Sequence, residues 1–332
     1  ALAAGASALL TERELEGLAP QLVVADVLEA SGRFGALKRQ AFEGDVIAIT
    51  GSAGKTTTKN LVAAALATTG EVHATVGNQN NELGVPITLS GLTGNHRFGV
   101  IEMGAGQPGD IAYLCTLAAP DVAVCLNASA AHLENYVDVS AIAKTKGEIF
   151  EGLSQQSLAV MSADQEWLPG WRKQAGNSRQ VTFGFSPKAD YRASDVAHHG
   201  VEGVSFHLTG PMGTLPVSLK LAGEQHVANA SAALAVQQLP LLFMDVTDVS
   251  DTRGLVRPRV QPVVEDPSYE QGGRRAPPGL DYDAGAIVIG CLRSGADGDA
   301  VQQQLATLEE TWQTLLQAIA DGKQELQQTA ES

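Results

Sequence analysis

Val46-Ile-Ala-Ile-Thr-Gly51-Ser-Ala-Gly54-Lys55-Thr56-Thr57 is the most informative stretch of this chain. The apolar run at its start is typical of a buried strand, and beyond Lys55 apolar residues recur at helical spacing. The stretch therefore predicts a strand, a glycine-rich turn and a helix. In such a turn, backbone N–H groups and the N-terminus of the helix face the phosphates of a nucleotide.

The end of this turn carries groups that suit a nucleotide. Lys55 supplies a full positive charge, and Thr56 offers a hydroxyl to a magnesium ion. The usual pattern of a phosphate loop is G-x-x-x-x-G-K-[ST], and Ile49 stands here at the first glycine position. A glycine-rich turn that binds nothing is the alternative. The strand before the turn, the helix after it and the Lys-Thr pair in register argue against that alternative.

Composition narrows the class of protein. With 332 residues the chain is long enough for two or three domains, and its net charge of −15 argues against nucleic acid as the main partner. The three cysteines are few and widely spaced, which favours a reducing compartment, and we expect the cytoplasm. The sequence contains no apolar run of membrane length, so we expect no stable membrane insertion. We also expect a monomer.

Short apolar runs alternate with helical patterns over 45–240. The runs are continuous, as buried parallel strands should be, and lie at 46–49, 98–103, 121–126 and 158–161. The helical patterns lie at 55–68, 108–118, 139–151 and about 225–239. We therefore predict an α/β fold with a doubly wound, mostly parallel sheet. Alternating segments predict a small antiparallel addition at 190–198, 202–209 and 214–221.

The two ends of the chain are predicted as incomplete flanking α/β domains. Residues 1–44 predict a short helix, a strand at 22–25 and a helix near 27–40. Over 241–332 the periodicity weakens, apart from a strand at 286–289 and a Gln-rich helix that closes the chain. We therefore divide the chain into 1–44, 45–240 and 241–332.

Polar features after the predicted strands are candidate ligand contacts, because ligands of an open α/β sheet bind outside the carboxyl ends of its strands. Glu102 suits a magnesium ion there, although a carboxylate at a strand end also caps turns. His132 is by itself a weak candidate, since a lone histidine is usually structural. The amide-rich loop that contains Asn78 can hold substrate or a metal-bound water, and a simple linker is the alternative.

Lys146 lies in the apolar stripe of the predicted helix at 139–151, together with Ile142, Ile149 and Phe150. Burial in such a stripe lowers the pKa of a lysine and leaves part of it neutral. A neutral amine reacts with carbon dioxide to form a carbamate, which is an anionic metal ligand. From the helix alone, a lysine that reaches past its apolar neighbours to solvent is the simpler interpretation.

Six short motifs follow one another along the sequence, at 50–57, 77–86, 100–105, 131–134, 143–150 and 223–230. Together, and in this order, they resemble the sequence motifs of the Mur ligase family. The resemblance is strongest to the members that add D-alanyl-D-alanine to UDP-N-acetylmuramoyl-tripeptide in peptidoglycan synthesis. It covers roughly residues 1–240.

The resemblance implies an enzyme: an ATP-dependent ligase in which a carboxylate is phosphorylated by ATP and an amine then attacks the acyl phosphate. It implies ATP and Mg²⁺ as cofactors, and UDP-N-acetylmuramoyl-tripeptide and D-alanyl-D-alanine as partners. Catalytic roles are implied for Lys55, Lys146, His132 and Asn78. Magnesium ligands would be Thr56, Glu102, His132 and a carbamylated Lys146. ATP contacts would be Gly51, Ser52, Ala53, Gly54, Lys55, Thr56, Thr57 and, beside adenine, Asn229.

Departures from the family pattern keep two alternatives open. Residues 1–44 match only the last part of the domain that holds the uridine nucleotide, and 241–332 carry faint echoes of the domain that closes over ATP. A nucleotide-binding remnant without turnover is the first alternative, which the divergent 241–332 segment favours. The second is another Mur-type ligase, such as a folylpolyglutamate synthase. The motif Asn-Asn-Glu-Leu-Gly-Val-Pro at 80–86 argues against this second alternative.

Overall fold

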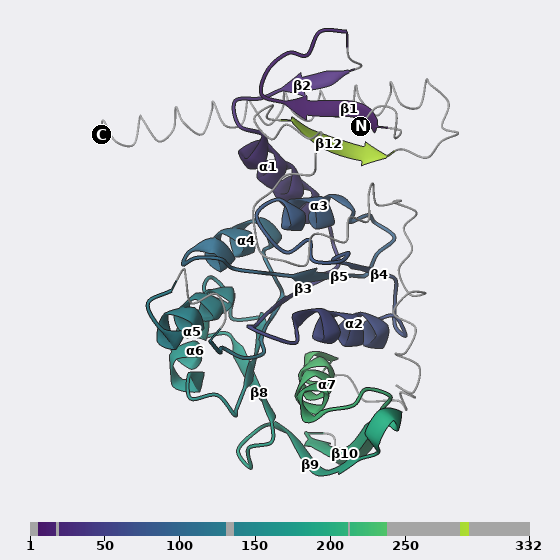
Figure 1. The fold of residues 1–332 in the computed structure, drawn as a ribbon, viewed down its shortest axis with the longest axis vertical. Helices are drawn as coiled ribbons and strands as arrows, with labels where there is room; N and C mark the ends of the chain where they lie inside the picture. Colours follow the sequence, from purple (N-terminus) through teal and green to yellow (C-terminus); the bar gives the residue numbers. More distant parts are fainter. Residues whose placement is uncertain (1–5, 18–19, 131–135, 212, 238–285, 292–332) are drawn as a thin grey trace. The chain divides into compact units, whose positions relative to one another are not determined.

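The computed structural model describes residues 6–17, 20–130, 136–211, 213–237 and 286–291 (Figure 1). The chain divides into two compact units. One combines residues up to Val27 with those from Arg259 onward, and the other is formed by Leu28–Pro258.

The first unit contains a three-stranded sheet in the order β12-β1-β2. Strand β1 (Ala6–Thr11) pairs in parallel with β2 (Gln21–Val23) and antiparallel with β12 (Ala286–Cys291). The strands expected near 22–25 and at 286–289 are therefore confirmed. The short helix expected before them is wrong for residues 6–11. Alanine and leucine favour a helix locally, but backbone hydrogen bonds to strands on both sides hold this segment extended.

The second unit is built on a nine-stranded sheet in the order β11-β10-β9-β8-β7-β6-β3-β5-β4. Neighbours from β4 to β9 run parallel, whereas β9, β10 and β11 pair antiparallel. The predicted parallel sheet with an antiparallel addition is thus confirmed. The strands are β3 (Asp45–Thr50), β4 (Val72–Ala74), β5 (Phe98–Glu102), β6 (Val122–Cys125), β7 (Leu158–Ser162), β8 (Arg179–Gly184), β9 (Tyr191–His198), β10 (Val204–Gly210) and β11 (Gly213–Leu219).

Helices cover both faces of this sheet (Figure 1). Ile47 and Ile49 of β3 belong to the apolar layer under α2 and α7, and Val46 and Ala48 belong to the layer on the other face. This alternation explains why the strand is apolar throughout, since both of its faces are buried. The helices are α1 (Val27–Gln40), α2 (Lys55–Leu66), α3 (Gly84–Ser90), α4 (Asp110–Ala118), α5 (Val139–Gly147), α6 (Leu168–Ala175) and α7 (Glu224–Gln237), with short 3₁₀ turns at Glu148–Phe150 and Gly200–Glu202.

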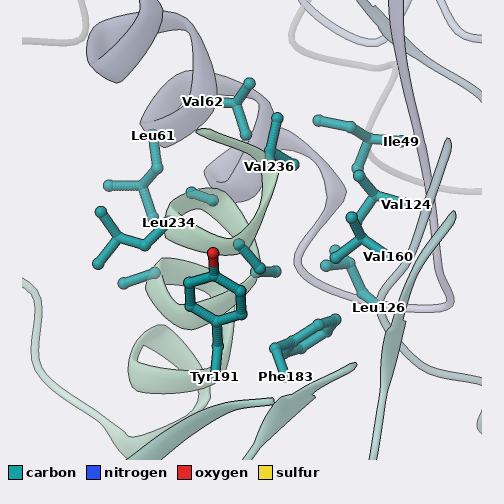
Figure 2. Packing of buried hydrophobic residues seen from close by; sticks show 14 of the residues in the cluster. Ile49, Leu61, Val62, Val124, Leu126, Val160, Phe183, Tyr191, Leu234 and Val236 are labelled. Atoms are coloured by element: carbon teal, nitrogen blue, oxygen red, sulfur yellow. The ribbon is translucent and has the colours of Figure 1, made fainter. Parts of the chain in front are cut away.

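The apolar layer between the sheet and helices α2 and α7 fixes the position of α2. The first turn of α2 forms the end of the glycine-rich loop. Figure 2 shows Leu61 and Val62 of α2 and Leu234 of α7 in this layer, opposite side chains from the strands. All three are buried. Truncation of such a leucine to alanine typically costs about 2–5 kcal/mol. The helix that carries Lys55 and Thr56 is therefore strongly anchored.

Helices α3 and α6 and strand β8 had no counterpart among the predicted elements. Helix α3 begins inside the amide-rich segment and contains Pro86, which its first turn tolerates because the N–H groups there have no partner within the helix. None of the described helices has the length and hydropathy that a membrane span requires. The assignment of 1–44, 45–240 and 241–332 to three ligase domains stays a prediction. The Gln-rich helix expected after 300 lies outside the described residues.

Candidate nucleotide-binding site

The glycine-rich loop, residues 50–57, connects β3 to α2. Gly54 has a φ of 84°, a left-handed conformation that glycine adopts without strain. A Cβ at Gly54 would lie 2.4 Å from Oδ1 of Asn229 on α7, so a side chain there would also require Asn229 to move. The Thr58 N–H donates to the Gly54 carbonyl over 2.9 Å and closes the first turn of α2.

The N-terminus of α2 is suited to an anion. The N–H groups of residues 55–57 precede the first intrahelical hydrogen bond, so the helix itself gives them no acceptor. No side chain among the described residues caps this end. Together with the helix dipole, these amides form the kind of site that binds phosphate.

A second loop, after β6, holds the glycine-rich loop in shape. Asn127 accepts from the Ala53 N–H at 3.0 Å through Oδ1 and donates to the Ala53 carbonyl at 3.1 Å through Nδ2. Its carbonyl accepts from the Ser52 N–H. The Ser52 hydroxyl donates to the Ser129 carbonyl and accepts from the Ser129 N–H. Five hydrogen bonds therefore fix the turn before Lys55, a role that sequence reasoning did not assign to Asn127 or Ser129.

Thr56 and Glu102 meet at the carboxyl ends of β3 and β5. The Thr56 hydroxyl donates to Oε2 of Glu102 at 2.9 Å, and Asn80 Nδ2 donates to Oε1 at 2.8 Å. Glu102 is 2% exposed. Its backbone N–H donates to the hydroxyl of Thr75, which follows β4. A buried carboxylate and a hydroxyl from different elements thus face one another beside the loop.

Two buried lysines of α2 interact electrostatically with this carboxylate. Lys55 Nζ donates to the Gly51 carbonyl at 2.8 Å, and Lys59 Nζ donates to the Thr75 carbonyl at 2.6 Å. Burial lowers the pKa of both lysines, and the charge of Glu102 opposes that shift. The pair therefore offsets part of the negative charge that Glu102 brings to the site.

Lys146 is buried, as its place in the apolar stripe predicts. It is 5% exposed, and its pKa is lowered from 10.5 to about 8 by burial and then by the charge of Lys55. Cys125, Asp110 and Glu148 oppose the shift. The repulsion by Lys55 means that Lys146 of α5 lies within electrostatic reach of the phosphate loop. Lys144, two residues earlier, is exposed.

The remaining predicted residues have different positions. Asn78 is exposed in a turn, and its carbonyl accepts from the Asn80 N–H at 2.7 Å. It is Asn80 whose side chain contacts Glu102, and the catalytic role of Asn78 stays a prediction. Asn229 lies against Gly54. His132 lies outside the described residues.

The arrangement fits both magnesium and a nucleotide. Mg²⁺ prefers oxygen ligands and is commonly held by one or two carboxylates together with substrate phosphates. Thr56 and Glu102 supply one hydroxyl and one carboxylate at the N-terminus of α2. Among the described residues no group of three or more His, Cys, Asp or Glu side chains is placed to hold a metal ion.

Sequence comparison and this geometry agree on the class of protein. The profile of the Mur ligase middle domain matches residues 49–237, from the end of β3 to the end of α7. The chain belongs to the Mur ligase family.

Individual relatives are more specific. The chain is 43% identical over 240 residues to the UDP-N-acetylmuramoyl-tripeptide–D-alanyl-D-alanine ligase of Escherichia coli (strain K12), which covers 71% of this chain and 52% of that enzyme. Among solved structures, MurF from Acinetobacter baumannii is similar with a TM-score of 0.65 and 35% identity, covering 68% of this chain and 50% of that one. MurF ligase from Thermotoga maritima, solved in complex with ADP, has a TM-score of 0.62 and 31% identity, covering 71% and 55%. The chain thus spans about half the length of the relatives it matches.

Proposed function

We propose that the protein is an ATP-dependent amide ligase of peptidoglycan synthesis, which joins D-alanyl-D-alanine to UDP-N-acetylmuramoyl-tripeptide. The observation that carries the proposal is the Thr56–Glu102 pair beside a phosphate loop, in a chain 43% identical over 240 residues to an enzyme of that name. Because ATP is the phosphoryl donor, the proposal places the reaction in the cytoplasm. The free, buried thiols of Cys115 and Cys125 agree with a reducing compartment.

The proposed reaction has two steps. The terminal carboxylate of the tripeptide first takes the terminal phosphoryl group of ATP and becomes an acyl phosphate. The neutral amine of D-alanyl-D-alanine then attacks the carbonyl carbon, the new C–N bond forms, the nitrogen gives a proton to solvent, and phosphate leaves with one of the original carboxylate oxygens. Phosphoryl transfer of this kind depends mainly on positioning and on neutralising the charge of the phosphate oxygens.

The residues of the phosphate loop would do this work. The N–H groups of residues 55–57 and the Lys55 ammonium would bind the phosphates, because they are the positive groups at the start of α2. Thr56 and Glu102 would hold Mg²⁺, which when bound neutralises charge on the phosphates. Asn80 keeps the Glu102 carboxylate oriented toward Thr56.

Lys146 would act as a carbamate. Its neutral amine nitrogen bonds to the carbon of carbon dioxide, a C–O π bond opens onto oxygen, and the amine gives a proton to water. Burial and a pKa of about 8 support this reaction, since they raise the neutral fraction far above that of a lysine in water. The carbamate would place an anionic oxygen near Lys55, whose charge disfavours the ammonium form.

Product analysis tests the proposal. The protein is incubated with ATP, Mg²⁺, UDP-N-acetylmuramoyl-tripeptide and D-alanyl-D-alanine, and phosphate release is followed together with the mass of the product. We expect the mass of the condensed product and one phosphate for each molecule formed, with little of either from Lys55→Ala. ATP binding without product would favour the nucleotide-binding remnant instead.

A further inference from the structure

Lys59 is a buried lysine that lies outside the phosphate loop and has no role in the proposed binding of phosphate. It is 4% exposed and lies one turn beyond Lys55 on α2. Residues four apart share one face of a helix, and so do residues three apart. Lys55, Thr56 and Lys59 therefore form one polar stripe, and Thr56 in that stripe contacts Glu102 directly.

A short chain of hydrogen bonds connects Lys59 to Glu102. Lys59 Nζ donates to the Thr75 carbonyl at 2.6 Å. The Thr75 hydroxyl accepts from the Glu102 N–H at 2.9 Å, and the Thr75 N–H donates to the Val100 carbonyl at 3.0 Å. Thr75 is 3% exposed, so these contacts are shielded from water. Lys59 thus holds the residue that fixes the backbone from which the Glu102 carboxylate projects.

A simple link between α2 and the end of β4 does not require a charge. A buried ammonium is costly unless it is compensated, and the Thr75 carbonyl is the one hydrogen-bond acceptor that the described residues give Lys59. The compensating charge is Glu102, which acts on Lys59 without a direct ion pair. A positive charge within electrostatic reach of Glu102, where a neutral donor could make the same hydrogen bond, indicates a role in the electrostatics of that carboxylate.

We propose that Lys59 is a positioning residue of the magnesium–nucleotide site, which acts through Thr75 to hold Glu102 in the geometry that binds the metal. The inference rests on the proposed function, because it takes Mg²⁺ and a nucleotide as the ligands. Lys59 is 4% exposed and its ammonium donates to the Thr75 carbonyl, so we expect it to contact neither ligand. Its effect should therefore be confined to the part of nucleotide affinity that depends on magnesium.

Calorimetric titration of the full chain with ADP, in Mg²⁺ and separately in EDTA, measures how much of the nucleotide affinity depends on magnesium. For the unchanged protein, we expect tighter binding in Mg²⁺ than in EDTA. Lys59→Met keeps the length of the side chain and removes the charge. It should bind ADP in EDTA like the unchanged protein and lose about 10–100-fold of the affinity in Mg²⁺, as is typical for residues that orient a metal ligand. Lys59→Arg should recover part of the loss.

Two further variants separate positioning from stability. Thr75→Val keeps the carbonyl that Lys59 contacts but removes the hydroxyl that accepts from Glu102, so it should reproduce the loss in Mg²⁺. It tests the link from Thr75 to Glu102, on which the proposal depends, even if Lys59→Met does not fold. Val62→Ala destabilises α2 on its apolar face and should keep the full magnesium effect. If Lys59→Met or Thr75→Val gains as much ADP affinity from Mg²⁺ as the unchanged protein, the proposed role of Lys59 is wrong, while the proposed magnesium site stands. If the unchanged protein gains no affinity from Mg²⁺, the proposed magnesium site is wrong as well.

Discussion

Replacing Lys146 by methionine should stabilise the folded protein while removing its ligase activity. Methionine has about the same length, so the buried space stays filled, but the charge disappears. At a pH near 7 and without carbon dioxide, the amine is an ammonium in both the folded and the unfolded chain. The folded state then bears a net cost of burying it, since within the described residues Lys146 has no hydrogen bond or ion pair and the charges of Asp110 and Glu148 offset the burial only in part.

The structure gives the size and the sign of the effect. A pKa lowered from 10.5 to about 8 corresponds to a cost of about 3 kcal/mol in folding free energy. The cost is fully present below the folded pKa of about 8 and is relieved as the pH rises from there toward 10.5, because the folded chain loses the proton before the unfolded chain does. The stability advantage of Lys146→Met should therefore shrink by about 2–3 kcal/mol between a pH of about 7 and a pH of about 10.

Urea unfolding in buffer stripped of carbon dioxide measures this advantage across the pH range. Lys144→Met is the matched control, because Lys144 is exposed on the same helix. It should change the free energy of unfolding by less than about 0.5 kcal/mol at every pH. If Lys146→Met is no more stable than the unchanged protein near neutral pH, or if its advantage does not depend on pH, Lys146 is not a buried ammonium that costs folding free energy, and the reasoning fails.

Three other predictions concern the phosphate loop and the same lysine. Lys55→Ala removes the one ionised side chain of residues 50–57 and should weaken ATP binding by roughly 1–3 kcal/mol, so equal affinities by calorimetry would contradict its role. Asn127→Ala removes two hydrogen bonds to Ala53 and should weaken ATP binding by roughly 1–2 kcal/mol; an unchanged affinity would mean that the loop keeps its shape unaided. Stripping carbon dioxide should slow turnover and bicarbonate should restore it, with Lys144→Ala active and Lys146→Ala inactive. A fully active Lys146→Ala would show that the carbamate is assigned to the wrong lysine.

The main sheet could be predicted because its signals are local. The apolar runs became β3, β5, β6 and β7, since a strand buried on both faces must be apolar throughout. Strand β1 could not be predicted in the same way. Its pairing with β12, hundreds of residues later in the chain, overrides the helical preference of its alanines and leucines.

The site shows the same division between local and distant signals. The rule that ligands lie at the carboxyl ends of strands was enough to bring Thr56 and Glu102 together. The apolar stripe pointed to a buried Lys146 but left open a side chain that reaches to solvent, and the structure shows it buried. Asn127 could have been found by the same rule, because it follows β6, which neighbours β3. The contact of Asn80 rather than Asn78 with Glu102 depends on the shape of a turn, which residue types alone do not specify.

Transfer of an isotope label tests the central claim, the acyl phosphate, most directly. The tripeptide is prepared with ¹⁸O in its terminal carboxylate and incubated with the protein, ATP, Mg²⁺ and D-alanyl-D-alanine. In the proposed reaction one carboxylate oxygen leaves with the phosphate, so each phosphate released by ligation should carry one ¹⁸O atom from the carboxylate. Phosphate without label, released at the rate of ATP consumption, would show that the carboxylate is never phosphorylated and would contradict the ligase mechanism.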